Sequence, residues 1–165
     1  MSDDPRAAAT GVLDLCRARG LKVATAESCT GGLVAGALTE IAGSSDVVDR
    51  GFVTYSNEAK QQMLGVPADT LRMHGAVSQE TAEAMARGAL GKGSADVVIA
   101  ITGIAGPGGG SADKPVGLVH FAAASRSGAL THAEMRYGDI GRSEVRRKSV
   151  LQALAMLKEM AEKRG

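Results

Sequence analysis

The chain has 165 residues, and 19 lysines and arginines against 18 aspartates and glutamates give it a formal net charge of +1 at pH 7. This length fits a single domain, which we expect to span residues 1–165. A charge so near zero provides no field that attracts polyanions, and four aromatic residues, none of them Trp, offer few platforms for stacked bases. Nucleic acid is therefore not an expected partner.

The sequence has no membrane segment, no disulfide framework and no metal-ligand spacing. No apolar run reaches the roughly 18 residues of a membrane span, and the opening MSDDPR is acidic where a signal peptide is basic. Cys16 and Cys29 are too few for a disulfide framework, and no CxxC or clustered His/Cys pattern suggests zinc. We expect a cytoplasmic protein with free thiols, no bound metal and no membrane contact.

The first 41 residues predict a helix followed by a strand-turn-helix unit. Apolar residues at helical spacing indicate a helix over 7–19, and Gly20 is a good signal for its end. KVATA at 22–26 has the composition of a short strand. After the turn ESCTGG, helical spacing returns over 33–41.

The same order is repeated in the next stretch of chain. Residues 47–55 predict a second strand, and Ser56 or Asn57 can cap a helix that Gly65 closes. Residues 66–75 are expected to be a connector between helices. A fourth helix is predicted over 78–91, opened by a loosened capping box.

The last third of the chain predicts three strands and a long helix. ADVVIAIT at 95–102 indicates a strand buried on both faces, and a glycine-rich loop follows it. Strands over 116–124 and 131–137 flank the turn SRSG, and the final helix covers 143–163. Five strands alternating with about five helices favour an α/β fold, which we expect to have three layers, α/β/α, around a mixed sheet.

Two junctions between a strand and the following helix contain candidate catalytic residues. Ser28 in ESCTGG lies at a helix start, where free backbone N–H groups can bind an anion or an oxyanion, although a simple helix cap is the plain alternative. Lys60 lies in the first turn of its helix, where desolvation lowers a lysine pKa, although a surface lysine is equally simple. If the first two strands are parallel neighbours, Ser28 and Lys60 can meet.

A third junction and the start of the last helix are candidate binding elements. The glycine-rich loop after Thr102 lets backbone N–H groups approach a ligand, but it matches neither a Walker loop nor a dinucleotide fingerprint. Arg142 can reach a phosphate or carboxylate from the start of the last helix, and a surface salt bridge is the alternative.

Five motifs, in this order, span nearly the whole chain: ESCTGG, GFVTYSNEAK, ITGIAGPGGG, KPVGLVHFA and GRSEVRR. Together they resemble the CinA C-terminal domain family. Within it the chain is similar to the stand-alone nicotinamide mononucleotide deamidases, because 165 residues leave no room for the amino-terminal domain of longer CinA proteins. The resemblance implies an α/β/α fold with a five-stranded, mostly parallel mixed sheet, and hydrolysis of nicotinamide mononucleotide to nicotinic acid mononucleotide and ammonia in pyridine nucleotide recycling. It also implies a homodimer or larger homo-oligomer and no cofactor.

The resemblance also assigns roles to individual residues. Ser28 is implied as the nucleophile, Lys60 as its base and Tyr55 as a hydrogen-bonding partner. We expect Cys29 to be a small buried side chain, because no histidine faces this turn to activate a thiol, and we expect the amides of the turn 30–32 to stabilise the oxyanion. The residues implied to bind substrate are Thr30, Gly31, Thr102, Gly103, Gly106, Gly108 and Arg142.

Two other functions fit the same sequence. A nucleotide-binding regulatory module would use the same fold and loop with Ser28 as a helix cap. A protein associated with DNA would fit the competence label of the family, although the charge and the scarcity of aromatic residues argue against it.

Overall fold

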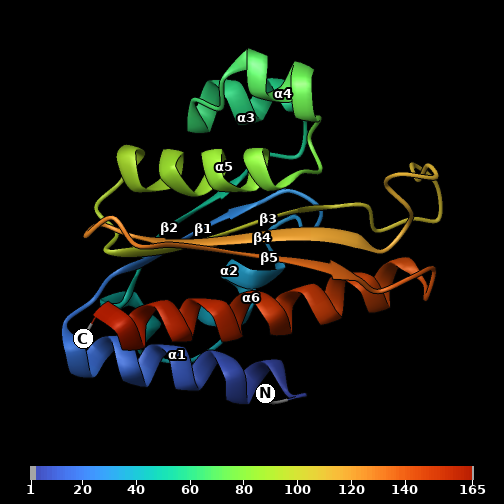
Figure 1. Cartoon of the computed structure of the whole chain (residues 1–165). Helices are drawn as coiled ribbons and strands as arrows, with labels where there is room; N and C mark the ends of the chain where they lie inside the picture. The colour runs from blue at the N-terminus through green and yellow to red at the C-terminus, as the bar shows by residue number, and fades with distance from the viewer. Residues whose placement is uncertain (1–2, 165) are drawn as a thin grey trace.

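A five-stranded sheet with the strand order β2-β1-β3-β4-β5 forms the middle layer (Figure 1). The computed structural model describes residues 3–164. β1 pairs in parallel with β2 and β3, whereas β4 pairs antiparallel with β3 and β5. Over this range β4 therefore runs against the other four strands, which confirms the mixed, mostly parallel sheet. The strands are β1 (Val23–Glu27), β2 (Val48–Val53), β3 (Val97–Gly103), β4 (Leu118–Ser125) and β5 (Leu130–Arg136).

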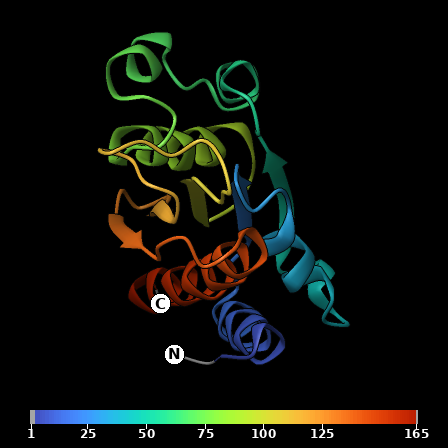
Figure 2. The same ribbon diagram turned by 90° about the vertical axis from the view of Figure 1, so that its right-hand side faces the viewer.

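Helices cover both faces of this sheet, so the expected α/β/α arrangement is confirmed. α5 packs on one face with α3 and α4 beyond it, and α2 and α6 pack on the other face with α1 outermost (Figures 1 and 2). The helices are α1 (Pro5–Arg19), α2 (Leu33–Thr39), α3 (Asn57–Leu64), α4 (Ala68–His74), α5 (Gln79–Lys92) and α6 (Arg142–Arg164), with a 3-10 turn η1 at Ser44–Asp46. No helix in the described part of the chain is long and apolar enough to cross a membrane.

Alanines bring α5 close to the sheet. Side chains alternate across a strand, so every second residue of β1, β3 and β4 faces α5. Many of these positions are alanine, and α5 presents alanines in return, so the layers approach with little side chain between them. The buried alanines of this interface are Ala24, Ala26, Ala82, Ala86, Ala89, Ala100, Ala122 and Ala124.

Local signals in the sequence set several helix ends as predicted. Gly20 ends α1 in the left-handed conformation, at φ 67°. Ser56 caps α3 by accepting a hydrogen bond from the Ala59 amide at 3.0 Å, and Ser78 caps α5 in the same way through the Thr81 amide at 3.1 Å.

The expectation that 66–75 is only a connector between helices is wrong. Residues 68–74 form α4, which follows the extended Pro67 and ends before Gly75. Seven residues with a single buried side chain, Leu71, are too few to show a helical period in the sequence. The described chain therefore contains six α-helices where five were expected.

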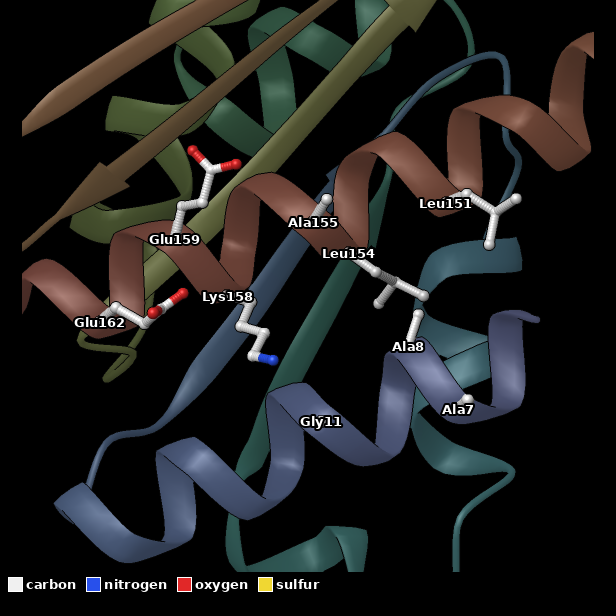
Figure 3. Close-up of a pocket in the computed structure, with 9 residues that line it drawn as sticks. All are labelled: Ala7, Ala8, Gly11, Leu151, Leu154, Ala155, Lys158, Glu159 and Glu162. Atoms are coloured by element: carbon white, nitrogen blue, oxygen red, sulfur yellow. The ribbon is translucent and has the colours of Figure 1, made fainter. Parts of the chain in front are cut away.

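A groove of about 300 Å³ lies between α1 and α6 (Figure 3). Small side chains line its α1 side, and the Lys158 side chain lies against Gly11, with Nζ 3.6 Å from the place a Cβ would take. None of the predicted site residues lines it. The groove lies on the contact between α1 and α6 and shares no lining residue with the cavity of the candidate active site described below.

Gly88 sets the distance between α5 and α3, the helix that carries Lys60. A Cβ at Gly88 would overlap the carbonyl oxygen of Leu64, whereas a Cβ at Gly91 in the same helix meets nothing within 4 Å. We predict that Gly88→Ala lowers the free energy of unfolding by about 1 to 3 kcal/mol. Gly91→Ala should leave it unchanged or raise it by up to about 1 kcal/mol. Urea unfolding of both variants measures this, and equal effects of the two would contradict it.

Candidate active site

The predicted junctions meet at the carboxyl ends of the three parallel strands. Glu27 at the end of β1 is in register with Val53 of β2 and Ile101 of β3, so the three following turns share one edge of the sheet. A cavity of about 190 Å³ opens there. It is lined by Ser28, Cys29, Tyr55, Lys60, Ala76, Val77, Thr102, Gly103, Ala105 and Arg142.

Ser28 and Lys60 are in direct contact, as the parallel pairing of their strands allows. Lys60 Nζ lies 3.0 Å from Ser28 Oγ. The same nitrogen donates to the backbone carbonyl oxygens of Thr54 at 2.9 Å and Tyr55 at 3.3 Å. Three oxygens therefore surround the amine, and two of them are carbonyl groups that can only accept.

Burial changes the chemistry of Lys60. Its side chain is 1% exposed, and no carboxylate in residues 3–164 forms an ion pair with it. Removal from water disfavours the charged amine and lowers the Lys60 pKa below its ordinary value of 10.5, although the nearby Cys29 thiol has a smaller, opposing effect.

The arrangement around the amine suits a base. A neutral lysine has two N–H bonds and one lone pair. If the carbonyls of Thr54 and Tyr55 accept the two N–H bonds, the lone pair faces the remaining neighbour, the Ser28 hydroxyl, which can donate. The pair can therefore move a proton from serine to lysine.

The turn after Ser28 is organised by Glu27, a residue that the sequence analysis did not select. Glu27 is fully buried, and its carboxylate accepts hydrogen bonds from the Thr30 hydroxyl and from the amides of Gly32, Val34 and Ala35. The expectation that the start of α2 is free to bind a ligand anion is therefore wrong. A carboxylate of the chain itself occupies that place.

Arg146 of α6, also missed by the sequence analysis, holds the same turn from the other side. Its Nε donates to the Cys29 carbonyl at 3.1 Å and its Nη2 to the Thr30 carbonyl at 3.3 Å. GRSEVRR contained the only available signal, but two adjacent arginines and Arg142 gave no means to choose among them.

Two of the amides expected to stabilise an oxyanion are already used within the turn. The Gly31 amide donates to the Ser28 carbonyl at 3.0 Å, and the Gly32 amide donates to Glu27 Oε1 at 3.3 Å. Thr30 has no exposed surface, and its hydroxyl is committed to Glu27. Neither Thr30 nor Gly31 lines the cavity, so the turn residues support the site without forming its wall.

Cys29 is packed as expected. It is 5% exposed and belongs to the core on the α6 side of the sheet. Burial raises the pKa of its thiol to about 12, so the thiolate is scarce at neutral pH. Next to Ser28, the thiol is thus a poor competitor for the role of nucleophile.

Tyr55 and Arg142 form the mouth of the cavity. Arg142 donates from Nη2 to the Tyr55 hydroxyl and from Nη1 to the Gly106 carbonyl, both at 2.8 Å. Tyr55 thus reaches Lys60 through its backbone carbonyl, and its phenol contacts Arg142 instead. Gly106 joins the site through this hydrogen bond without lining the cavity.

The residues after β3 divide into two groups. Thr102 lines the cavity and donates to the Ala76 carbonyl at 2.8 Å, and Gly103 lines it next to β4, where a Cβ would lie 2.7 Å from Val119 Cγ2. Gly108 is exposed, and the cavity lining does not include it. The loop therefore contributes its first residues to the site and projects its tip outward (Figure 1).

The three histidines lie outside this cavity. His120 is buried, and its Nδ1 lies 2.9 Å from Nε2 of His132. Within residues 3–164, no group of three or more His, Cys, Asp or Glu side chains is placed to hold a metal ion.

The fold and the site together define a class of protein. It is an α/β protein in which a buried lysine contacts a serine hydroxyl at the carboxyl ends of parallel strands. The model of the CinA C-terminal domain matches residues 6–161 of the chain. The chain therefore belongs to the CinA C-terminal domain family, as its motifs indicated.

Relatives of two lengths share this domain. The chain is 55% identical over 142 residues to the nicotinamide-nucleotide amidohydrolase PncC of Escherichia coli strain K12, covering 86% of this chain and 85% of that protein. It is 52% identical over 141 residues to a CinA-like protein of Anaeromyxobacter dehalogenans, but spans only 34% of that longer protein. The crystal structure of the competence/damage inducible protein CihA from Agrobacterium tumefaciens superposes with a TM-score of 0.92 at 60% identity, over 95% of this chain and 94% of that one.

The buried amine predicts a pH dependence of stability. Because the Lys60 pKa is lowered in the folded state, the unfolded chain binds more protons between that pKa and 10.5. Stability therefore rises with pH in this window, by at most about 1.4 kcal/mol per pH unit for one proton. Lys60→Met removes this contribution.

We expect the difference in unfolding free energy, wild type minus Lys60→Met, to increase from pH 7 towards pH 10.5. Urea unfolding at several pH values measures it. Lys92→Met, which changes an exposed lysine, is the control and should give a flat difference. If the difference for Lys60→Met is flat as well, burial does not lower the pKa of the Lys60 amine.

Proposed function

We propose that the protein hydrolyses the carboxamide of nicotinamide mononucleotide to nicotinic acid mononucleotide and ammonia. The observation that supports this most strongly is the Lys60 amine, held by two carbonyl oxygens and 3.0 Å from the Ser28 hydroxyl. Amide hydrolysis needs an activated nucleophile and an acid for the leaving group. The similarity to PncC over 86% of the chain supports the choice of substrate.

In the proposed mechanism, Lys60 moves a proton in both halves of the reaction. Ser28 Oγ passes its proton to neutral Lys60 and attacks the carboxamide carbon, forming a tetrahedral oxyanion. The C–N bond then breaks, the Lys60 ammonium protonates the departing nitrogen, and ammonia leaves an ester on Ser28. Lys60, neutral again, deprotonates a water molecule that cleaves the ester, and the proton returns to Ser28.

The oxyanion donors are assigned to the start of the turn. Within residues 3–164 the amides of Cys29 and Thr30 have no acceptor in another residue, although the Cys29 amide contacts its own thiol, whereas the amides of Gly31 and Gly32 are used internally. Cys29 also lines the cavity. Preorganised amides aimed at the developing charge are a large source of rate enhancement in acyl transfer.

We assign the pyridine carboxamide to the cavity and the ribose phosphate to its mouth. The cavity of about 190 Å³ is smaller than the roughly 300 to 1,000 Å³ that encloses a drug-sized ligand. Arg142 uses two of its five N–H groups on Tyr55 and Gly106, which leaves three for a phosphate or ribose oxygen. The proposal includes the cytoplasmic location expected from the sequence, and a homodimer or larger homo-oligomer, as the family resemblance implies.

Measuring ammonia release from the mononucleotide tests the proposal. Variants of the two neighbouring candidate nucleophiles, Ser28 and Cys29, are compared with wild type. Ser28→Ala should lose about three orders of magnitude or more in turnover while still binding the mononucleotide, as seen by calorimetry. Cys29→Ala should keep turnover within a few-fold and lower stability by about 1 kcal/mol.

The opposite pattern, an active Ser28→Ala and a silent but folded Cys29→Ala, would overturn the serine-lysine mechanism. A wild-type protein that binds the mononucleotide without releasing ammonia would be a regulatory binding module instead. Free nicotinamide, which lacks the ribose phosphate, serves as the comparison substrate and should be turned over far less efficiently.

A further inference from the structure

We propose that Glu27 is a positioning residue: its buried carboxylate fixes the turn that presents Ser28 to Lys60. The inference rests on the proposed function, because it concerns the same nucleophile. Glu27 lies directly before Ser28, at the end of a strand paired on both sides. Four donors converge on its carboxylate, and all four belong to the segment that follows the nucleophile.

The carboxylate holds this segment through both oxygens. Oε1 accepts from the Thr30 hydroxyl, from the Gly32 amide at 3.3 Å and from the Val34 amide at 2.9 Å. Oε2 accepts from the Ala35 amide at 3.0 Å. The contacts therefore tie the strand end before Ser28 to the helix start after it, across the turn that contains the nucleophile.

The backbone of Glu27 also reaches the lysine side of the site. Its carbonyl accepts a hydrogen bond from the Thr54 amide at 2.8 Å, and the Thr54 carbonyl accepts from Lys60 Nζ at 2.9 Å. One residue is thus connected to both members of the pair. The Glu27 side chain fixes the turn that contains Ser28. The Glu27 main chain fixes Thr54, whose carbonyl accepts a hydrogen bond from Lys60.

The site requires an acceptor that carries two oxygens. Glu27 has no exposed surface and forms no ion pair within residues 3–164, so its direct partners there are N–H and O–H donors. Glutamine has nearly the same shape but only one oxygen. Its NH₂ group would face at least one donor, such as the Ala35 amide, and that hydrogen bond would be lost.

The geometry also changes the role of Thr30, which the sequence analysis assigned to substrate binding. Its hydroxyl donates to Glu27, and it has no exposed surface. Removing this hydroxyl should therefore loosen the turn and lower kcat. A direct contact with substrate would instead appear as a higher KM.

The test compares Glu27→Gln and Thr30→Val with Glu40→Gln, which changes an exposed glutamate at the other end of α2. Glu27→Gln should lower kcat about tenfold to a hundredfold, since a small misplacement of a nucleophile has effects of this size. Thr30→Val should lower kcat about threefold to tenfold. Both should keep KM for the mononucleotide within about twofold, and Glu40→Gln should match wild type.

The pH profile separates positioning from a change at the base. Lys60 keeps its carbonyl partners in both variants, so the midpoint of the rise of kcat/KM with pH should stay where it is in wild type. A shifted midpoint, a change confined to KM, or wild-type kcat in both folded variants would overturn the proposal. If Glu27→Gln does not fold, Thr30→Val alone decides by the same criteria.

A second readout keeps this inference distinct from the proposed function. A fluorophosphonate probe labels an activated serine without any nucleotide, and its rate should fall in Glu27→Gln and Thr30→Val but not in Glu40→Gln. If wild type is labelled but releases no ammonia, the substrate is wrong and labelling still tests positioning. Equal labelling of all four proteins would refute the positioning role of Glu27. A wild type that is neither labelled nor active on the mononucleotide would refute both this role and the proposed function.

Discussion

The site depends on one constraint: an amine removed from water without a counter-ion. Lys60 is almost completely buried, and three oxygen atoms replace its hydration. Loss of water lowers its pKa, and the two carbonyl oxygens give the neutral amine a definite orientation towards Ser28. The same burial that disfavours the charged lysine thus supports the proposed role of Lys60 as the base for the Ser28 hydroxyl.

The rest of the fold can be understood as the support of this contact. Parallel pairing of β1 with β2 and β3 puts three strand ends at one edge, and Glu27 and Arg146 fix the turn at the middle strand from opposite sides. Alanines between α5 and the sheet, and Gly88 against Leu64, bring α3 close enough for Lys60 to reach Ser28. Small residues in these interfaces therefore set the short distance between Lys60 and Ser28.

The sequence was sufficient for the layers, the strands and the Ser28–Lys60 pair, because periodicity and strand-to-helix junctions depend on neighbours along the chain. It did not predict α4, whose seven residues show no period. It also missed Glu27 and Arg146, because their partners are set by the closing of a turn and by the packing of α6. The contacts of Glu27 and Arg146 with the turn explain why Thr30 and Gly31 do not line the cavity, although their motif suggested binding. Gly106 and Gly108 do not line it either, and Gly108 lies in the exposed part of the loop.

Titration of Lys60 measures directly whether burial lowers the pKa of its amine. Lysines labelled with ¹³C at Cε can be followed by NMR from neutral to alkaline pH, and the Lys60 signal is assigned by its absence in Lys60→Met. We expect this signal to titrate at a lower pH than the signals of the exposed lysines, which should change near the ordinary value of 10.5. A Lys60 signal that titrates together with the exposed lysines, or above them, would show that burial does not lower the pKa of this amine.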